Sequence, residues 1–171
     1  MRLQNIITQQ RLQELLSYDP ETGLFINLTQ RSNRIKTGSV AGHKRQDGYI
    51  KIMLDGKLYL AHRLAWLYIY GEFPKKGLDH VDENPSNNRI SNLRLATHQE
   101  NSHNQSSPRT DNTSGFRGVS WSKRHQKWTA RIKLNEKYKN LGYFNTAEQA
   151  SEAHLKAKRE NHPFWVEDKV A

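Results

Sequence analysis

Hydrophobic positions along the chain recur with two spacings, which predict a mixture of helices and strands. Residues 9–17 carry leucines at helical spacing, and residues 23–28 have the composition of a strand that follows a turn. Further along, two alternating segments flank Asp55-Gly56, a dipeptide typical of tight turns. We therefore predict a β-hairpin over residues 48–63.

The middle of the chain predicts a helix and then a domain boundary. Residues 63–71 are strongly apolar and predict a buried helix that ends at Gly71. Its large side chains are expected in the core: Trp66, Leu67 and Tyr70. Residues 105–114 hold no aliphatic or aromatic side chain, a composition typical of a linker. We therefore predict an N-terminal domain over residues 1–104 and a C-terminal domain over residues 115–171.

The C-terminal domain is predicted to be a three-stranded antiparallel sheet followed by a helix. Its short alternating segments are residues 118–123, 127–135 and 139–144. In the second segment, Trp128, Ala130, Ile132 and Leu134 alternate with Thr129, Arg131 and Lys133. One face should therefore be packed and the other basic, with Trp128 favoured as core over base stacking. Thr146 and Gln149 form a capping box at the start of the helix. The expected fold class is α+β.

Charge sharpens this picture, because the chain has a net charge of +10 and a pI near 9.9. Between residues 115 and 145 stand eight Lys and Arg residues against one acidic residue, Glu136. Aromatic side chains interleave with them: Trp121, Trp128, Tyr138 and Tyr143. A basic stretch mixed with aromatics is typical of a nucleic-acid surface. The alternative is a basic protein whose charge serves only solubility.

The composition also excludes several classes. Cysteine is absent, which excludes disulfides and thiolate zinc sites. No apolar run reaches about 18 residues, so no membrane span is expected. The N-terminal residues are too polar for a signal peptide. We therefore expect a cytoplasmic protein with no membrane partner.

The most unusual stretch is residues 78–104, which holds six asparagines, three histidines and two aspartates. It predicts a strand, a long polar loop, a second strand and a helix that starts at Thr97. In that arrangement Asp79 and Asn101 could converge on a hard cation such as Mg²⁺. His80 would point the other way along the strand and could act as a base. The alternative is an Asn-rich turn before a capped helix, with His80 a structural histidine.

The spacing of these residues resembles the HNH (ββα-metal) nuclease motif of homing endonucleases. The residues that carry the resemblance are Asp79-His80, Asn87-Asn88, Asn92-Leu93-Arg94, Thr97, Asn101 and Asn104. Residues 48–74 also resemble the region before the motif in phage members, and the resemblance covers roughly residues 20–104. It implies a ββα-metal fold in which one divalent ion and a histidine base hydrolyse a DNA strand.

Carried over residue by residue, the resemblance makes His80 the general base. Asp79 and Asn101 hold the metal ion, Mg²⁺ or alternatively Mn²⁺. Asn92 orients the loop beside His80, and Asn88 is the alternative for that role. Many family members have histidine at the position of Asn101, so this departure leaves the metal preference open.

Residues 115–160 resemble the AP2 DNA-binding domain. The matching segments are Gly115-Phe116-Arg117-Gly118-Val119, Lys127-Trp128-Thr129-Ala130-Arg131-Ile132, Leu141-Gly142-Tyr143-Phe144 and Thr146-Ala147-Glu148-Gln149-Ala150. The family places its sheet in the major groove with the helix behind it. DNA contacts are then expected from Arg117, Arg131 and Lys133, and also from Trp121 and Lys123. Ser120, Ser122 and Asn140 depart from plant members, so their target sequence cannot be carried over.

The resulting hypothesis is a homing-type DNA endonuclease, a hydrolase of phosphodiester bonds in double-stranded DNA. If phage-encoded, it would work in the cytoplasm of a bacterial host, and no protein partner is implied. One alternative is a non-catalytic AP2-type DNA-binding regulator with a degenerate HNH module, and a weaker one is an RNA-binding protein. For Arg63 and Arg94, helix packing and phosphate contact are both open.

Overall fold

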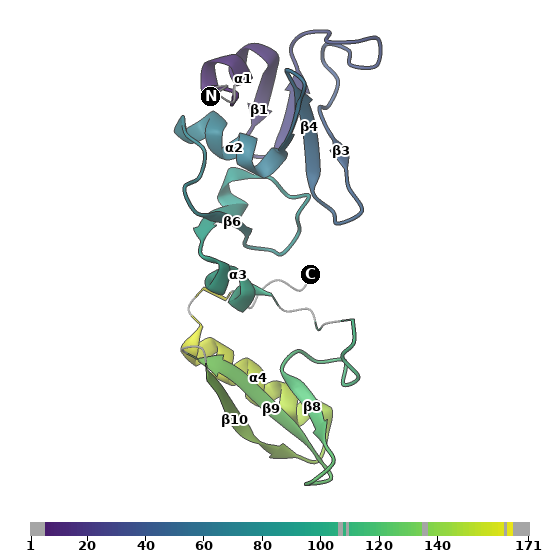
Figure 1. Cartoon of the computed structure of the whole chain (residues 1–171), viewed down its shortest axis with the longest axis vertical. Helices are drawn as coiled ribbons and strands as arrows, with labels where there is room; N and C mark the ends of the chain where they lie inside the picture. The colour runs from purple at the N-terminus through teal and green to yellow at the C-terminus, as the bar shows by residue number, and fades with distance from the viewer. Residues whose placement is uncertain (1–5, 106–107, 109, 135–136, 163, 166–171) are drawn as a thin grey trace, which may run out of the picture. The chain divides into compact units, whose positions relative to one another are not determined.

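A computed structural model gives the fold of this chain (Figure 1). It describes residues 6–105, 108, 110–134, 137–162 and 164–165. The chain divides into two compact units, Met1–Gln99 and Glu100–Ala171, and each is described by itself. This division falls five residues before the predicted end of the N-terminal domain at residue 104. The domain limits 1–104, 105–114 and 115–171 stay a prediction.

From residue 6 onward, the first unit combines the α-helices α1 and α2 with three small sheets. Its first half contains α1 (Gln9–Leu15), β1 (Leu16–Asp19), β2 (Leu24–Asn27), β3 (His43–Lys44), β4 (Ile50–Leu54), β5 (Lys57–Leu60) and α2 (Ala61–Tyr70). Strands β1 and β2 form one antiparallel sheet, and β3, β4 and β5 form another in that order. The third sheet, formed by β6 and β7, belongs to the site described below.

Helix α1 is shorter than the predicted helix over residues 9–17. It begins after Thr8, whose side-chain oxygen accepts a hydrogen bond from the backbone N–H of Arg11. It ends at Leu15, because Leu16 is already extended and pairs with Asn27 in the β1–β2 hairpin. Strand pairing thus takes over the last residues of a pattern with helical spacing.

The hairpin predicted around Asp55-Gly56 is confirmed. Asp55 and Gly56 both have positive φ angles, 45° and 77°, as a two-residue hairpin turn requires. The strands on either side pair Leu54 with Lys57 and Lys51 with Leu60. The hairpin leads directly into α2, which begins at the residue after β5.

Helix α2 confirms the apolar segment and corrects one of its predicted core residues. It ends at Gly71, which adopts the left-handed conformation with φ 78°. Leu67 is buried and Trp66 packs against the core from a partly buried position. Tyr70 is 55% exposed, so its prediction as a core residue is wrong. Its ring instead packs against that of Trp66 with the two planes tilted by 40° and the centroids 4.3 Å apart.

The second unit contains the predicted three-stranded antiparallel sheet and helix. Its strands are β8 (Val119–Ser122), β9 (Lys127–Leu134) and β10 (Lys137–Phe144), with β9 in the middle. Helix α4 (Ala147–Asn161) packs against this sheet (Figure 1). Both hydrogen bonds of the capping box between Thr146 and Gln149 are present. The small residues Ala147 and Ala150 pack on Val119 and Ala130.

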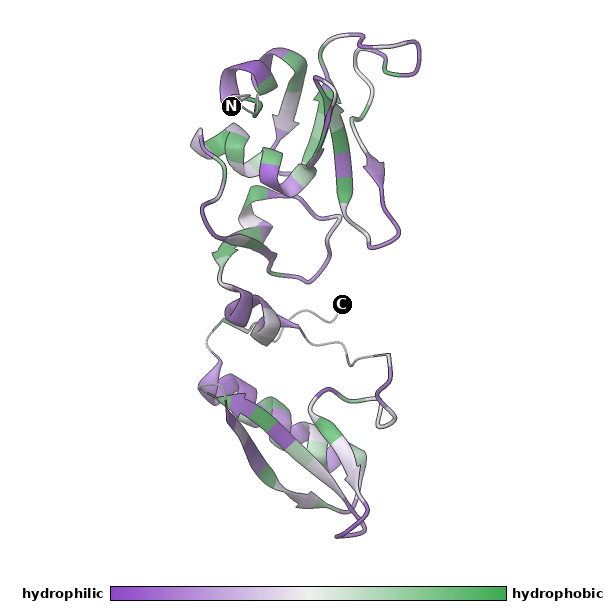
Figure 2. Cartoon of the chain, in the orientation of Figure 1, coloured by the Kyte–Doolittle hydropathy of each residue, from purple (hydrophilic) through white to green (hydrophobic). Residues whose placement is uncertain are grey.

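Helices α2 and α3 differ in the hydropathy of their residues (Figure 2). Helix α3 (His98–Asn104) is hydrophilic along its length, whereas α2 carries mainly hydrophobic residues. In the part of the chain that the structure describes, no helix has both the length and the apolar character to cross a membrane.

Candidate functional site

The Asn-rich stretch folds as the predicted strand, loop, strand and helix. Strands β6 (Gly77–His80) and β7 (Leu93–Ala96) are antiparallel, and the one-turn 3₁₀ helix Ile90–Asn92 leads into β7. Asp79 lies opposite Arg94 in the register, and His80 lies opposite Leu93. Successive side chains of a strand point to opposite faces, so Asp79 and His80 leave β6 in different directions.

Asp79 is buried and forms an ion pair with Arg94. Both Nε and Nη2 of Arg94 donate to Oδ2 of Asp79, at 3.0 and 2.9 Å. Arg94 therefore binds a carboxylate, which neither of the two alternatives from the sequence had anticipated. Arg63, the other undecided arginine, lies over the ring of Phe73 at 5.8 Å and packs on the protein itself.

His80 is 5% exposed at the end of β6. Burial lowers the pKa of its imidazole, although the side chain of Asn88 and the charges of Asp82 and Asp79 act in the opposite direction. The net pKa lies below the usual value near 6.5. His80 is therefore neutral at neutral pH, the form that can accept a proton.

The loop after His80 is organised around Asp82. Asn87 Nδ2 donates to Asp82 Oδ2 at 2.6 Å, and Asn92 Nδ2 donates to Asp82 Oδ1 at 2.9 Å. In return, the backbone N–H of Asp82 donates to Asn92 Oδ1 at 3.0 Å. Asn92 Nδ2 also reaches the backbone oxygen of Asn87 at 2.9 Å. Asn92 thus joins both ends of the loop, and its orienting role beside His80, with Asn88 as the alternative, stays a prediction.

Asp82 is a residue that sequence reasoning missed. Burial raises its pKa, but hydrogen bonds from Asn87, the backbone of Asn84 and Asn92 outweigh it, and the net pKa is lowered. Asp82 is therefore an ionised carboxylate that accepts hydrogen bonds from Asn87, Asn92 and the backbone of Asn84. Its signal in the sequence was its place two residues after His80, ahead of Asn84, Asn87 and Asn92.

The rest of the first unit holds this loop in place. The hydroxyl of Tyr18 donates to the backbone oxygen of Asn88 at 2.7 Å. Gly23 lies against the same segment, so that a Cβ atom there would stand 2.5 Å from the backbone nitrogen of Arg89. On the other side, Ser86 Oγ donates to the backbone oxygen of Gly48 at 2.8 Å. The loop is thus attached both to the β1–β2 hairpin and to the β3–β4 turn.

Two further aromatic rings surround His80. The ring centroid of His62 lies 5.1 Å from that of His80, and the centroid of Tyr49 lies 5.8 Å from it. His62 and Tyr49 are 5.4 Å apart, so each of the three rings contacts the other two. Sequence reasoning missed both, because 31 and 18 residues separate Tyr49 and His62 from His80 along the chain.

Asn101, the second predicted metal ligand, lies on α3 within the second unit, and its convergence with Asp79 stays a prediction. The end of this helix is attached to its own unit. Arg117 donates to the backbone oxygen of Ser102 at 3.2 Å and to Gln105 Oε1 at 3.3 Å. Lys158 Nζ donates to the backbone oxygen of Gln105 at 2.9 Å. Arg117, predicted to contact DNA, therefore faces the end of α3.

The sheet of the second unit presents a basic outer face. Residues directly opposite each other on neighbouring strands point to the same face of the sheet. The face away from α4 therefore carries Ser120, Thr129, Arg131, Lys133, Tyr138, Asn140 and Tyr143. Arg131 is exposed and Lys133 half-buried, so these two predicted DNA contacts lie on one face. Thr129 also belongs to this face but is buried, with its hydroxyl donating to Asn140 Oδ1 at 3.1 Å.

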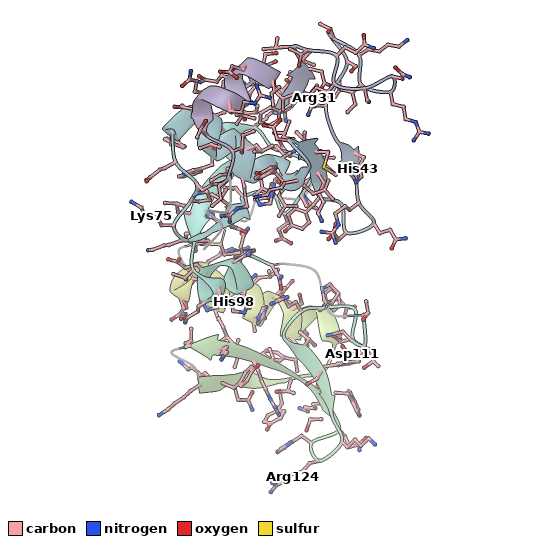
Figure 3. All side chains as sticks on the ribbon, turned by 45° about the horizontal axis from the view of Figure 1, so that its top comes forward. Arg31, His43, Lys75, His98, Asp111 and Arg124 are labelled. Carbon is pink, nitrogen blue, oxygen red and sulfur yellow. The ribbon has the colours of Figure 1, made fainter. Side chains whose placement is uncertain are left out.

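The remaining predicted DNA contacts lie elsewhere. Trp121 lies opposite Trp128 in the register and touches its ring, so it shares the face of the core residue Trp128. Its side chain is nevertheless 43% exposed. Lys123 is exposed in the turn between β8 and β9, next to Arg124, which extends from the tip of that turn (Figure 3). Trp128 packs against the cluster of Val119 and the helix alanines, which confirms its core role.

The donors available for a metal ion are oxygens. Among the described residues, no group of three or more His, Cys, Asp or Glu side chains could hold a metal ion. The set that the sequence predicted, one carboxylate and one amide oxygen, instead suits a hard cation that completes its shell with water and phosphate. The buried carboxylate of Asp79 fits this chemistry, with Arg94 already compensating part of its charge.

Comparison with known proteins bears on the same residues. Residues 59–103 match the family model described as HNH endonuclease. This segment is an HNH endonuclease domain. The HNH domain begins at β5 and runs into α3, so it includes His62, Asp79, His80, Asn92 and Asn101.

Proteins similar to this chain occur in viruses. The chain is 41% identical to Protein 3.8 of Escherichia phage T7 over 81 residues, which cover 47% of this chain and 66% of that protein. It is 44% identical to the uncharacterized HNH endonuclease L560 of Acanthamoeba polyphaga mimivirus over 66 residues, or 38% and 34% of the two chains. The chain thus spans less than two thirds of either relative.

A solved structure is also similar to this chain. It describes DNA binding and cleavage by the HNH homing endonuclease I-HmuI, and is 25% identical with a TM-score of 0.41. The match covers 87% of this chain and 88% of that chain.

Proposed function

We propose that this protein is a DNA endonuclease of the homing type, which hydrolyses phosphodiester bonds of double-stranded DNA. One observation carries the proposal: within the HNH domain, a buried imidazole with a lowered pKa follows directly on the buried carboxylate of Asp79. General-base hydrolysis at neutral pH needs such a neutral imidazole. Hydrogen bonds between Asp82 and Asn92 hold the loop that directly follows this histidine.

In the proposed reaction, His80 accepts a proton from a water molecule. The water oxygen forms a bond to phosphorus, and the bond from phosphorus to the 3′ oxygen breaks. The departing 3′ oxygen takes up a proton, so the products carry a 5′-phosphate and a 3′-hydroxyl. Asp79 and Asn101 would hold a Mg²⁺ or Mn²⁺ ion, which when bound stabilises the negative charge on the phosphate and on the leaving oxygen.

The second unit would bind and place the DNA as an AP2-like domain. Its outer sheet face carries Arg131 and Lys133 beside two exposed aromatic residues. Tyr138 is 75% exposed and Tyr143 is 40% exposed. Arginine can read guanine edges with two hydrogen bonds, and lysine grips phosphates. A sheet backed by a helix and carrying cations on its open face suits the major groove.

A second candidate is a DNA-binding regulator whose HNH module has lost catalysis. The ion pair between Asp79 and Arg94 favours it, because the guanidinium occupies one carboxylate oxygen that a metal ion could otherwise use. Nicking of a supercoiled plasmid with Mg²⁺, with Mn²⁺ and with EDTA separates the two functions. The endonuclease predicts nicks only with a divalent ion, and the regulator predicts none under any condition.

The decisive variant is His80→Ala. We expect it to lose cleavage by about 10²-fold or more, the scale of a missing general base, with DNA affinity unchanged. His43→Ala is the matched control, because His43 is exposed on β3 in the same unit (Figure 3). Cleavage by His80→Ala at the rate of the unmodified protein would exclude the assigned base.

A further inference from the structure

His62 is a buried histidine to which the proposed reaction assigns no role. It is the second residue of α2 and is 6% exposed. Its Nδ1 atom is buried and has no hydrogen-bond partner among the described residues. Burial, and then the charges of His80 and Arg63, lower its pKa to about 3, so the ring is neutral. Hydrogen bonding through Nδ1 thus explains neither the presence nor the orientation of this side chain.

Packing against His80 does explain it. The planes of the His62 and His80 rings meet at 82°, with the centroids 5.1 Å apart. This edge-to-face arrangement is the favoured contact between two aromatic rings. Tyr49 closes the group, because its ring is tilted by 54° to His62 and by 63° to His80.

The backbone fixes both partners of His80. Helix α2 follows directly on the paired strand β5, which determines where its first turn lies. Tyr49 stands next to Gly48, where a Cβ atom would come within 2.7 Å of Pro85 in the loop after His80. The backbone positions from which both rings extend are therefore held by elements that belong to the core or to the loop.

A general base needs this kind of support. Rotation of an imidazole about its outer side-chain bond has broad, roughly two-fold preferences, so the bond itself aims the ring nitrogens poorly. Catalytic groups lose activity when they are misplaced by as little as an ångström. A flat neighbour packed edge-to-face against the His80 ring limits rotation about that bond.

We propose that His62 is a positioning residue, whose ring keeps the His80 imidazole in the orientation that proton transfer from water requires. This inference rests on the proposed nuclease function. Two experiments test it, one of which reads the orientation of His80 without any cleavage.

The first experiment compares nicking by His62→Ala and His62→Phe. Alanine removes the flat neighbour, so kcat should fall about tenfold or more, with KM and DNA affinity unchanged. Phenylalanine restores a ring and should recover most of the lost kcat. Leu67→Ala is the control, because Leu67 is buried on the same helix but is not one of the rings around His80. It should lower the melting temperature and leave kcat unchanged at temperatures well below melting.

Two results of this experiment would overturn the proposal. One is a kcat for His62→Ala equal to that of the unmodified protein. The other is a kcat for His62→Phe as low as that for His62→Ala, since a ring in place would then not help.

The second experiment records NMR spectra of protein with labelled histidine, and His80→Ala identifies the His80 signals. In the unmodified protein, ring currents from His62 and Tyr49 should displace the His80 ring protons from their positions in an unfolded chain. Because His62→Ala also removes the ring current of His62 itself, the orientation of His80 is read from nuclear Overhauser contacts between its ring protons and those of Tyr49. These contacts should weaken in His62→Ala, and unchanged contacts would overturn the proposal. A protein that never nicks DNA refutes the proposed function, whereas these spectra still decide whether His62 orients His80.

Discussion

Asp82 shows how a residue can support a reaction that it does not enter. Its carboxylate accepts hydrogen bonds from two side-chain amides of the loop, those of Asn87 and Asn92, and its backbone N–H donates to Asn92 Oδ1 in turn. Because these side chains donate hydrogen bonds to one another and accept them in return, removal of one side chain leaves several polar groups without a hydrogen-bond partner. The loop beside His80 is therefore a single polar network.

Asn92→Ala tests that network. The substitution removes the two amide hydrogen bonds to Asp82 and Asn87 and the acceptor for the backbone N–H of Asp82. We expect the free energy of unfolding to fall by about 1–3 kcal/mol, measured by urea denaturation. Asn33→Ala, at an exposed asparagine of the same unit, is the control and should change stability little. Equal losses for both variants would contradict the role of the network.

His154 should make stability depend on pH. Burial, and then the charges of Lys158, Arg117 and His162, lower its folded-state pKa to about 4, below the unfolded value of 6.5. The unfolded chain thus binds more protons between these two values, so stability falls as the pH drops through this window. From pH 7 to pH 5 we expect a loss of about 2 kcal/mol from this group.

His154→Gln should remove that part of the pH dependence, measured by denaturation at both pH values. His98→Gln is the control, because His98 is exposed on α3 (Figure 3). If both variants keep the same difference in stability between pH 7 and pH 5, His154 does not contribute to the pH dependence of stability.

The sequence could predict the site residues that lie in one short segment, but not those that the fold brings close from elsewhere in the chain. Asp79, His80 and Asn92 were identified because one short segment carries them. Asp79 and His80 lie at the end of β6 and Asn92 binds Asp82 in the loop that follows, while their roles stay a prediction. His62 and Tyr49 reach His80 only through the packing of α2 and of the β3–β4 turn, which no local pattern encodes. The contact of Arg94 with Asp79 depends on the register of two strands, which the sequence did not fix.

Among the elements, the hairpin β1–β2 does more than fill the first unit. Its turn residue Gly23 has a φ of 73° and leaves no room for a side chain next to Asn88 and Arg89. Tyr18, on the first strand, binds the backbone oxygen of Asn88. The hairpin therefore supports the loop from a distant part of the sequence.

Gly23→Ala should break this support. The added methyl group would overlap the backbone of Asn88 and Arg89, at 2.6 and 2.5 Å, in addition to the strain of a positive φ. Gly38→Ala is a matched control, because Gly38 has a φ of 80° and nothing within 4 Å of the added atom. Thermal or urea unfolding should show Gly23→Ala less stable than the control by about 2 kcal/mol. Identical stabilities would mean that the loop yields without cost.

Elements with a strong local signal were predicted well, whereas strand β1, which only pairing decides, was not. The Asp55-Gly56 hairpin, helix α2 and the capped start of α4 all have turn or cap residues that act locally. Strand β1 was missed because its residues continue the helical spacing of leucines, and only pairing with β2 decides between the two structures. Tyr70 was misplaced because an apolar segment does not reveal which side of its helix faces solvent.

For the whole molecule, the division of labour between the units has a measurable consequence. If the outer face of the β8–β10 sheet grips DNA phosphates, its cations release counterions on binding. Replacing Arg131 and Lys133 by glutamine should lower the slope of log affinity against log salt by about 2 in magnitude. Affinity at several salt concentrations gives this slope by fluorescence anisotropy.

The control for this measurement removes the same charge elsewhere. Lys75 and Lys76 are exposed in the segment after α2, and Lys75 is seen at the surface in Figure 3. Their double replacement by glutamine should leave the salt slope nearly unchanged. An equal reduction by both double variants would show that total charge, rather than the sheet face, determines DNA affinity.

Strand β10 is an edge of its sheet, and its composition limits what else can join it. An open edge invites a strand from another molecule, the first step of many aggregates. Here Lys137 and Lys139 are exposed along that edge, and a bulge between Asn140 and Gly142 breaks the regular ladder. Copies of the protein crowded side by side should therefore remain separate molecules instead of merging their sheets.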